Sequence, residues 1–231
     1  MTKRFYSFFR AKRPLCLLFA LFLTCLTALG FCGCKKSPTL TDYVSEYRNN
    51  LFLYECDTFL VKAQNVEKEH PYVADGYKGE MTHRAELFIT PSTAVQSCQV
   101  FFIAGGIEHR GEASYDTVKK HFYYSCAADL SQAQSFPLRI QLDETEYEIT
   151  LTSIKEEGML DLNQLLTHLF GSETELASAL INGKEFLGEL YVRLLYENAP
   201  YFYVGVIDRS GNVSAFLMDG KTGKILAKRT T

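Results

Sequence analysis

The sequence contains no tryptophan, and it has no long apolar run after residue 33. With 47% hydrophobic and 22% charged residues, this excludes a wholly disordered chain and a polytopic membrane protein. The first 33 residues lack aspartate and glutamate but hold five of the 24 lysines and arginines. The other 198 residues therefore carry 19 basic and 27 acidic side chains, a formal charge of −8. A domain this acidic is a poor candidate for binding nucleic acid through phosphate contacts.

The sequence also lacks the short motifs of common catalytic and metal sites. It contains no G-x-S-x-G, S-x-x-K, P-loop or dinucleotide-binding glycine run. Its five histidines form no H-x-x-x-H or H-E-x-x-H pattern, and no Cys/His spacing resembles a zinc site. His70 and His83 flank a turn-rich loop and are expected at the surface. We therefore predict no catalytic residue, no metal and no cofactor.

The N-terminal segment has the features of an export signal. Residues 1–13 are basic, residues 14–31 are almost wholly apolar, and FCGC then precedes two lysines. This ending resembles a bacterial lipoprotein signal, in which an apolar residue and two small ones precede the acylated cysteine. Cys34 follows the small Gly33 and fits that pattern better than Cys32, which follows the bulky Phe31.

The lipoprotein resemblance implies a signal peptide over residues 1–33 and a lipidated tether over 34–41. The Cys34 sulfur would carry a diacylglyceryl group, with a fatty acid such as palmitate on the new amino terminus in some bacteria. Two or more acyl chains hold a protein stably on a bilayer. The alternative is an uncleaved signal anchor, since a run of 18 apolar residues is at the lower edge of spanning length. In both cases the chain is attached to the cell membrane and faces the extracytoplasmic side.

Residues 42–155 are predicted to form a β-rich, immunoglobulin-like sandwich. Residues 42–50 are read as a short helical lead-in. Six runs rich in β-branched and aromatic residues follow, separated by turn-forming residues. The alternation in LRIQL (138–142) and YEITLTSI (147–154) predicts a hairpin. Six or seven short strands over ~110 residues are typical of such a sandwich.

Residues 158–231 change to helix-then-strand order. Asp161 with Gln164, and Ser172 with Glu175, are capping-box pairs that predict two helices. Alternating runs at 188–198, 201–208, 213–219 and 224–229 predict an antiparallel meander packed on them. The sequence thus predicts an α+β protein: a sandwich followed by a helix-plus-meander domain.

The final hairpins carry a second resemblance. FYVGVIDRSGNVSAFLMDGKTGKIL looks like the strand–turn–strand ending of PepSY-type domains. In that family a strand reaches an aspartate, turns at a glycine, and returns to a D-x-K-T-G turn before a closing strand. The resemblance implies an extracytoplasmic module that inhibits or regulates, alone or with a peptidase. The matching positions are Asp208, Gly211, Asp219, Lys221, Thr222, Gly223, Ile225 and Leu226.

Three cysteines lie outside the predicted signal: Cys56, Cys98 and Cys126. An exported protein can oxidise a pair. Cys98 and Cys126 stand in two predicted strands, as the cross-sheet disulfide of a sandwich does, so they are the candidate pair. The alternative is that all three are small buried apolar residues. No Cys-x-x-Cys motif follows the signal, which argues against a redox site at these thiols.

Aromatic residues are abundant, with 14 tyrosines and 17 phenylalanines. Several cluster in the first two predicted strands of the meander, and alternation cannot bury all of them on one face. An exposed patch of Tyr191, Tyr201 and Tyr203 is therefore a candidate partner surface. The alternative is that these rings cover the helices and the junction between the two predicted domains.

These features favour a non-catalytic binding or regulatory module for another envelope protein, such as a peptidase. The reasons are the anchor and the absence of any convergent acid, base, nucleophile or metal set in the sequence. The alternative is an extracytoplasmic hydrolase, or a subunit of one, whose site is assembled only in the fold. A deep pocket that pairs a histidine with Asp, Glu or Cys126 would indicate this alternative.

Overall fold

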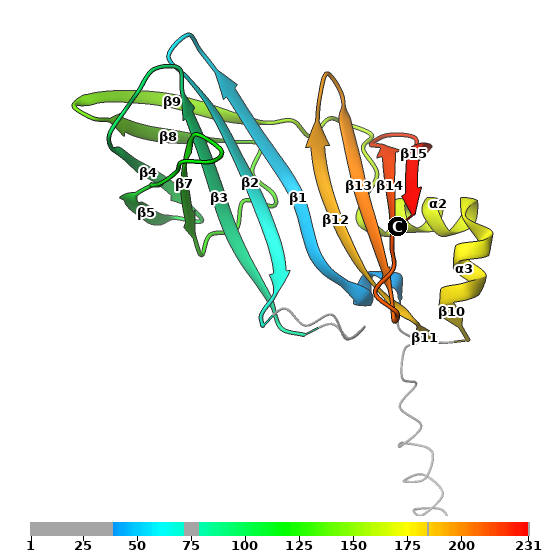
Figure 1. The fold of residues 1–231 in the computed structure, drawn as a ribbon. Coiled ribbons are helices and arrows are strands. Elements are labelled where there is room, and N and C mark those ends of the chain that lie inside the picture. The colour runs from blue at the N-terminus through cyan, green and yellow to red at the C-terminus, as the bar shows by residue number, and fades with distance from the viewer. Residues whose placement is uncertain (1–38, 72–78, 184, 231) are drawn as a thin grey trace, which may run out of the picture. The chain divides into compact units, whose positions relative to one another are not determined.

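The computed structural model describes residues 39–71, 79–183 and 185–230, which belong to a compact unit spanning Pro38–Thr231. Strands account for 59% of the structure and helices for 12% (Figure 1). The helical elements are the 3₁₀ turn η1 (Leu40–Tyr43), α2 (Leu162–Ser172) and α3 (Thr174–Leu180). The strands are β1 (Val44–Glu55), β2 (Phe59–Glu69), β3 (Met81–Pro91), β4 (Cys98–Ala104), β5 (Ile107–Glu112), β6 (Ser114–Asp116), β7 (His121–Cys126), β8 (Ser135–Leu142), β9 (Thr145–Ser153), β10 (Ile181–Asn182), β11 (Glu185–Phe186), β12 (Gly188–Tyr196), β13 (Pro200–Asp208), β14 (Val213–Asp219) and β15 (Ile225–Thr230).

Thirteen of these strands form one sheet with the order β15-β14-β13-β12-β1-β2-β3-β7-β6 and a branch β9-β8-β4-β5 that joins at β1. The branch curls round until β5 approaches β7. Gly111 on β5 packs on the Tyr124 ring of β7, where an added Cβ would lie 2.8 Å from the ring atom Cε2. The strands from β1 to β9 therefore make a nearly closed, barrel-like sheet.

Strand β1 belongs to both halves of the sheet, and Figure 1 shows it in blue between β2 and β12. Its first half pairs in parallel with β12, and its far end pairs with β9 at Phe52 and Leu53. The register shifts between Val44 and Glu46 against β12, and between Arg48 and Asn50 against β2. Such irregularities bend a strand and increase its twist. They let β1 leave one half of the sheet and enter the other.

Two hydrophobic cores lie against this sheet. The first fills the barrel-like part, with side chains such as Phe52, Val61 and Leu87 excluded from solvent. The second lies between α2, α3 and the strands β12 to β14, and includes Leu165 and Val204. Full burial of one such side chain contributes about 1.5–3 kcal/mol. By the strand register, the barrel-core side chains of β2 and β3 and the second-core side chains of β12 and β13 point to the same side of the sheet.

Several local predictions are confirmed. Asp161 caps α2 by accepting from the Gln164 amide at 2.8 Å, and the Gln164 side chain returns a bond to the Asp161 amide at 3.0 Å. The predicted hairpin is β8–β9, with Leu138 opposite Ile149 and Ile140 opposite Tyr147. Strand β14 has the predicted bounds.

Other local predictions are wrong. Residues 42–50 are mostly strand rather than helix, since β1 begins at Val44. Their polar side chains are buried through bonds to distant residues, which the local pattern does not show. The second helix is not capped by Ser172: its N-cap is Glu173, which makes no side-chain capping bond.

The predicted fold class, an α+β protein with a separate sandwich and a helix-plus-meander domain, is also wrong. The first half is a nearly closed barrel-like sheet rather than two packed sheets, and helices are a minor part of the chain. The strands of the predicted second domain continue the same sheet through the β1–β12 pairing. Strand count and alternation are compatible with either architecture, because neither reveals which strands pair.

Within the described residues, no helix has the length and apolar character needed to cross a membrane. The predicted signal over residues 1–33, the acylated Cys34 and the first part of the tether lie outside the described residues.

Candidate functional site

One surface of the sheet is common to both halves, and we call it the open face. Residues directly opposite each other on paired strands point to the same side of a sheet. The printed register therefore places Phe88 beside Lys62, Arg48 beside Arg193, and Arg193 beside Tyr203 on one side. The barrel core and the helices lie on the other side. Among the described elements, no helix covers the open face. Its residues on the central strands include Arg84, Glu86 and Phe88 of β3; Lys62, Gln64, Val66 and Lys68 of β2; Glu46, Arg48 and Glu55 of β1; Glu189, Tyr191 and Arg193 of β12; and Tyr201, Tyr203 and Gly205 of β13.

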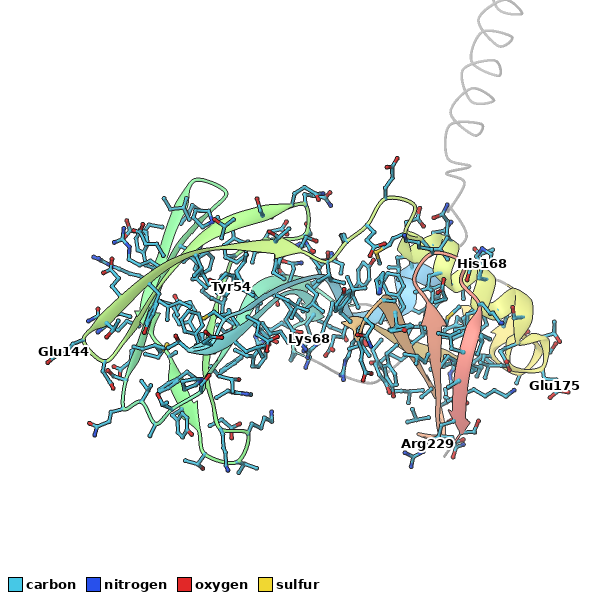
Figure 2. The ribbon with its side chains drawn as sticks, turned by 90° about the horizontal axis from the view of Figure 1, so that it is seen from above. Tyr54, Lys68, Glu144, His168, Glu175 and Arg229 are labelled. Carbon is cyan, nitrogen blue, oxygen red and sulfur yellow. The ribbon has the colours of Figure 1, made fainter. Side chains whose placement is uncertain are left out.

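The centre of the open face is a buried carboxylate held by two arginines. Glu46 Oε1 accepts from Arg48 Nε at 2.8 Å and from Arg193 Nε at 2.7 Å. The Glu46 side chain is only 6% exposed, whereas those of Arg48 and Arg193 are 25% and 41% exposed. Lys68 Nζ lies 3.8 Å from Glu46 Oε2. Figure 2 labels Lys68, which lies where the barrel-like part meets the helix-bearing part of the sheet.

The charges of the arginines keep Glu46 ionised. Burial alone raises the pKa of this carboxyl group, but the hydrogen bonds and positive charges of Arg48 and Arg193 outweigh burial and lower the pKa below 4.5. The three groups therefore carry a net charge of +1 at neutral pH. Breaking such a cluster by removing one partner is costly, because an uncompensated charge stays partly buried.

A second carboxylate extends the cluster across β2 and β3. Glu86 Oε2 accepts from Gln64 Nε2 at 2.6 Å and lies 3.5 Å from Arg48 Nη1. Glu86 Oε1 accepts from the Tyr123 hydroxyl at 3.1 Å. Strands β7, β3, β2, β1 and β12 are thus connected by polar side chains on one surface.

A groove of about 520 Å³ continues from Arg48 toward the edge of the sheet. Phe88 forms its aromatic centre, with its ring centroid 5.2 Å from both the His121 and the Tyr123 rings. The groove thus combines aromatic surface with charges of both signs. It is lined by Arg48, Glu86, Phe88, Ser114, Tyr115, Asp116, Lys119, His121 and Tyr123.

The groove contains a serine, an aspartate and a histidine, but they do not form a catalytic triad. Within the described residues, no hydrogen bond joins Ser114 to His121. Asp116 Oδ1 accepts instead from the amides of Val118 and Lys119 at 2.9 Å, which closes the β6–β7 turn. These contacts give Asp116 a role in the turn.

The predicted partner-surface residues Tyr191, Tyr201 and Tyr203 all lie on the open face and are half-buried. The Tyr191 ring lies 5.9 Å from the Tyr203 ring, and the Arg193 guanidinium lies 5.2 Å from the Tyr191 centroid. Tyr191 covers Gly205, where an added Cβ would overlap the ring. These contacts fix one aromatic ring beside one arginine.

The charged residues of this cluster were not singled out from the sequence. Alternation places Arg193 on the polar side of its strand, which is the only local sign of its role. Glu46 and Arg48 lie in a segment read as helix. Their partner Arg193 is more than 140 positions away, so no local pattern reveals the pairing.

The three cysteines are free thiols in the structure. Cys98 is buried on β4, and burial raises its pKa to about 12. Cys126 on β7 and Cys56 are partly buried, and burial also raises the pKa of Cys126. A Cys98–Cys126 disulfide stays a prediction. The alternative, a small buried apolar residue, fits the position of Cys98.

His83 lies near an aspartate of another segment, whereas Asp208 and Asp219 bind residues of their own turns. His83 lies on β3, with Nδ1 3.9 Å from Asp129 Oδ1. Asp208 Oδ1 accepts from the Ser210 and Asn212 amides, and Asp219 Oδ1 accepts from the Thr222 amide at 2.7 Å. Both aspartates thus stabilise hairpin turns. The described residues contain no group of three or more His, Cys, Asp or Glu side chains that could hold a metal ion.

A cavity of about 680 Å³ lies on the opposite side of β1 and is bordered by Tyr47, Glu67, Lys155 and Phe202. Polar groups that border it are held by hydrogen bonds: Asn49 Nδ2 donates to Glu67 Oε1 at 2.5 Å, and Lys155 Nζ donates to the Ser131 carbonyl at 3.2 Å. We infer that these contacts hold the segment after β9 against β1.

Comparison with protein-family models, with curated proteins and with solved structures finds no match for this chain.

Proposed function

We propose that this chain is a membrane-anchored extracytoplasmic lipoprotein that acts as a non-catalytic binding or regulatory module for another envelope protein. Its attachment rests on the signal-like segment that ends at Cys34. Its binding role rests on the open face, and the partner contacts that face across β12, β13 and the groove beside Phe88.

The observation that supports this proposal best is the combination of tyrosines and arginines on the side of the sheet that none of the described helices covers. Tyr191, Tyr203 and Arg193 pack on one another, and all three are partly accessible. Tyrosine and arginine are the residue types that most often dominate binding energy at protein interfaces. Rings and guanidinium groups fixed in advance lose little conformational entropy on association.

The test is position-specific photo-crosslinking in intact cells. A photoreactive amino acid replaces Tyr203, and the matched control carries it at Ile107, which is 64% exposed on β5 away from the open face. We expect position 203 to give one discrete protein adduct that position 107 does not give. Exchanging Cys34 for Ala should remove the adduct, because the chain then loses its anchor.

Two results would contradict the proposal. The same adducts from positions 203 and 107 would mean that the open face has no selective partner. An adduct at position 203 that persists with unchanged yield when Cys34 is replaced would mean that membrane attachment through Cys34 is not part of the function.

A further inference from the structure

We propose that Arg48 and Arg193 form a carboxylate-binding site on the open face, and that the ligand is an extended acidic segment of the partner protein. This inference rests on the proposed function, since it names the chemistry by which the open face recognises a partner.

The hydrogen bonds of the two arginines leave donors available. Both arginines bind Glu46 through Nε alone, at 2.8 and 2.7 Å. The terminal nitrogens of Arg193 donate no hydrogen bond to any described residue, and Arg48 Nη1 makes only a long 3.5 Å contact with Glu86. A guanidinium group carries further N–H donors whose geometry matches a carboxylate in a two-bond arrangement.

The site is also held in place before a ligand arrives. Glu46 fixes the inner edge of both guanidinium groups, and the Tyr191 ring supports Arg193 at 5.2 Å. Tyr191 in turn rests on Gly205. A long side chain that is already fixed loses less entropy when it binds, so this arrangement favours binding by the free donors.

The local charge favours an acidic ligand. The open face of β1, β2, β3 and β12 carries five basic side chains against the four acidic side chains of Glu46, Glu55, Glu86 and Glu189, whereas the chain after residue 33 has a formal charge of −8. Glu46 neutralises one of its two arginines, so the site has a net charge of +1. That charge matches a single carboxylate better than a doubly charged phosphate.

The dimensions suit an extended segment. From β7 to β13 the face crosses five strand-to-strand steps, a distance of about 24 Å, which equals about seven extended residues. Over this length the segment would pass the Phe88 groove, the two arginines and the tyrosine pair. Carboxylates near its middle would meet Arg48 and Arg193.

The test measures binding of a defined probe to the full chain in a neutral detergent. The probe is a fluorescent nine-residue peptide of alternating glutamate and threonine, and its counterpart has glutamine in place of glutamate. The variants are Arg193→Gln, Arg193→Lys and Arg48→Gln. The matched control is Arg139→Gln on β8, because Arg139 is 46% exposed, lies 5.2 Å from the Phe101 ring, and already binds Glu146 and Glu148.

We expect the acidic peptide to bind at least tenfold more tightly than its glutamine counterpart. Arg193→Gln and Arg48→Gln should each weaken binding at least tenfold, Arg193→Lys at least threefold, and Arg139→Gln less than twofold.

If Arg48→Gln fails to fold, the two Arg193 variants carry the test, since that side chain is the more exposed. Equal losses at Arg193 and Arg139 would overturn the proposal, because they indicate a general charge effect. Tighter binding of inorganic phosphate than of the peptide would also overturn it.

The peptide measurement separates this inference from the proposed function. If crosslinking at Tyr203 captures a partner but the acidic peptide does not bind, the carboxylate site is wrong and the binding role stands. If the peptide binds at Arg193 but no partner is captured in cells, the carboxylate site stands and the proposed partner contact is wrong.

Discussion

Glu46 is the residue whose ionisation controls the arginine cluster most directly. Its carboxylate fixes both Arg48 and Arg193, and their charges lower its pKa despite burial. A carboxyl group whose pKa is lower in the folded chain stabilises the fold above its unfolded pKa. That contribution is lost as the pH falls through the folded pKa.

Exchanging Glu46 for Gln should therefore destabilise the fold in a pH-dependent way. We expect a loss of about 1–3 kcal/mol at pH 7, because both arginines remain partly solvated. The gap between the free energies of unfolding of the variant and the original chain should narrow as the pH falls below about 4.5, where the Glu46 carboxylate begins to take up a proton in the unfolded chain, and should narrow further as the pH falls through its lower pKa in the folded chain. Urea unfolding at pH 7 and pH 3.5 measures this. The exposed pair of Arg110 with Glu108 supplies the control Glu108→Gln, and a gap that does not change with pH would contradict the assignment.

Gly205 is important because the absence of a side chain leaves room for the Tyr191 ring. A Cβ at this position would overlap the Tyr191 ring. We expect Gly205→Ala to lower the free energy of unfolding by about 1–3 kcal/mol and to displace Tyr191. Thermal unfolding and the near-ultraviolet dichroism of tyrosine measure the two effects. Gly171 in α2 has no atom near its Cβ position, so Gly171→Ala should be neutral or stabilising, and equal losses at both glycines would show that Tyr191 is not the cause.

At the scale of elements, strand β1 joins the two halves of the sheet, and its Asn50 also binds the loop of residues 130–133. Asn50 Nδ2 donates to the carbonyls of Leu130 and Ala133 at 2.8 and 2.9 Å, and Asn50 Oδ1 accepts from Ser153 Oγ at 2.6 Å. Asn65 Oδ1 accepts from the Leu130 amide at 2.7 Å. These amides satisfy backbone groups of residues 130–133 that would otherwise be buried without partners.

Exchanging Asn50 for Ala should lower the free energy of unfolding by about 2–4 kcal/mol, because it leaves buried carbonyl groups without donors. Asn212→Ala is the control, since Asn212 makes its bonds in an exposed hairpin turn and its loss should cost under about 1 kcal/mol. Chemical denaturation of both variants measures the difference. Similar costs would mean that the Asn50 contacts do not hold the loop.

Elements were predictable where local chemistry alone decides them. The Asp161 capping box and the alternation of residues 213–219 lie within a few positions, so α2 and β14 follow from the sequence. Strand β1 does not, because Ser45, Glu46 and Asn50 are polar residues buried by partners from distant strands. The arginine cluster was not predicted for the same reason, because its members come from strands that are distant in the sequence. The three tyrosines, in contrast, were predicted from alternation.

At the scale of the whole molecule, the shared strand predicts cooperative unfolding. Strand β1 supplies residues to both hydrophobic cores, with Phe52 in one and Leu51 in the other. Separating β12 from β1 would expose apolar surface in one half and free the edge of the other, so the halves should unfold together. Hydrogen exchange measured by mass spectrometry should give β3 and β13 the same opening free energy. Exchange of β13 at clearly lower denaturant than β3 would contradict this.

The pairing of β1 with β12 also makes the open face continuous, and this continuity was not predictable from the sequence. Residues 84–88 and residues 191–205 were assigned to separate predicted domains, because alternation describes each strand but not its neighbours. The partner surface is correspondingly wider than the three tyrosines, since it includes Arg193, Arg48 and the groove beside Phe88.

The most direct measurement of the central claim uses photo-crosslinking from two ends of the open face in intact cells. One chain carries the photoreactive residue at His121 on β7, and another carries it at Tyr203 on β13. If the open face acts as one binding surface, both positions should give adducts with the same partner protein. Adducts with two different proteins, or an adduct from only one of the two positions, would contradict a single continuous binding surface.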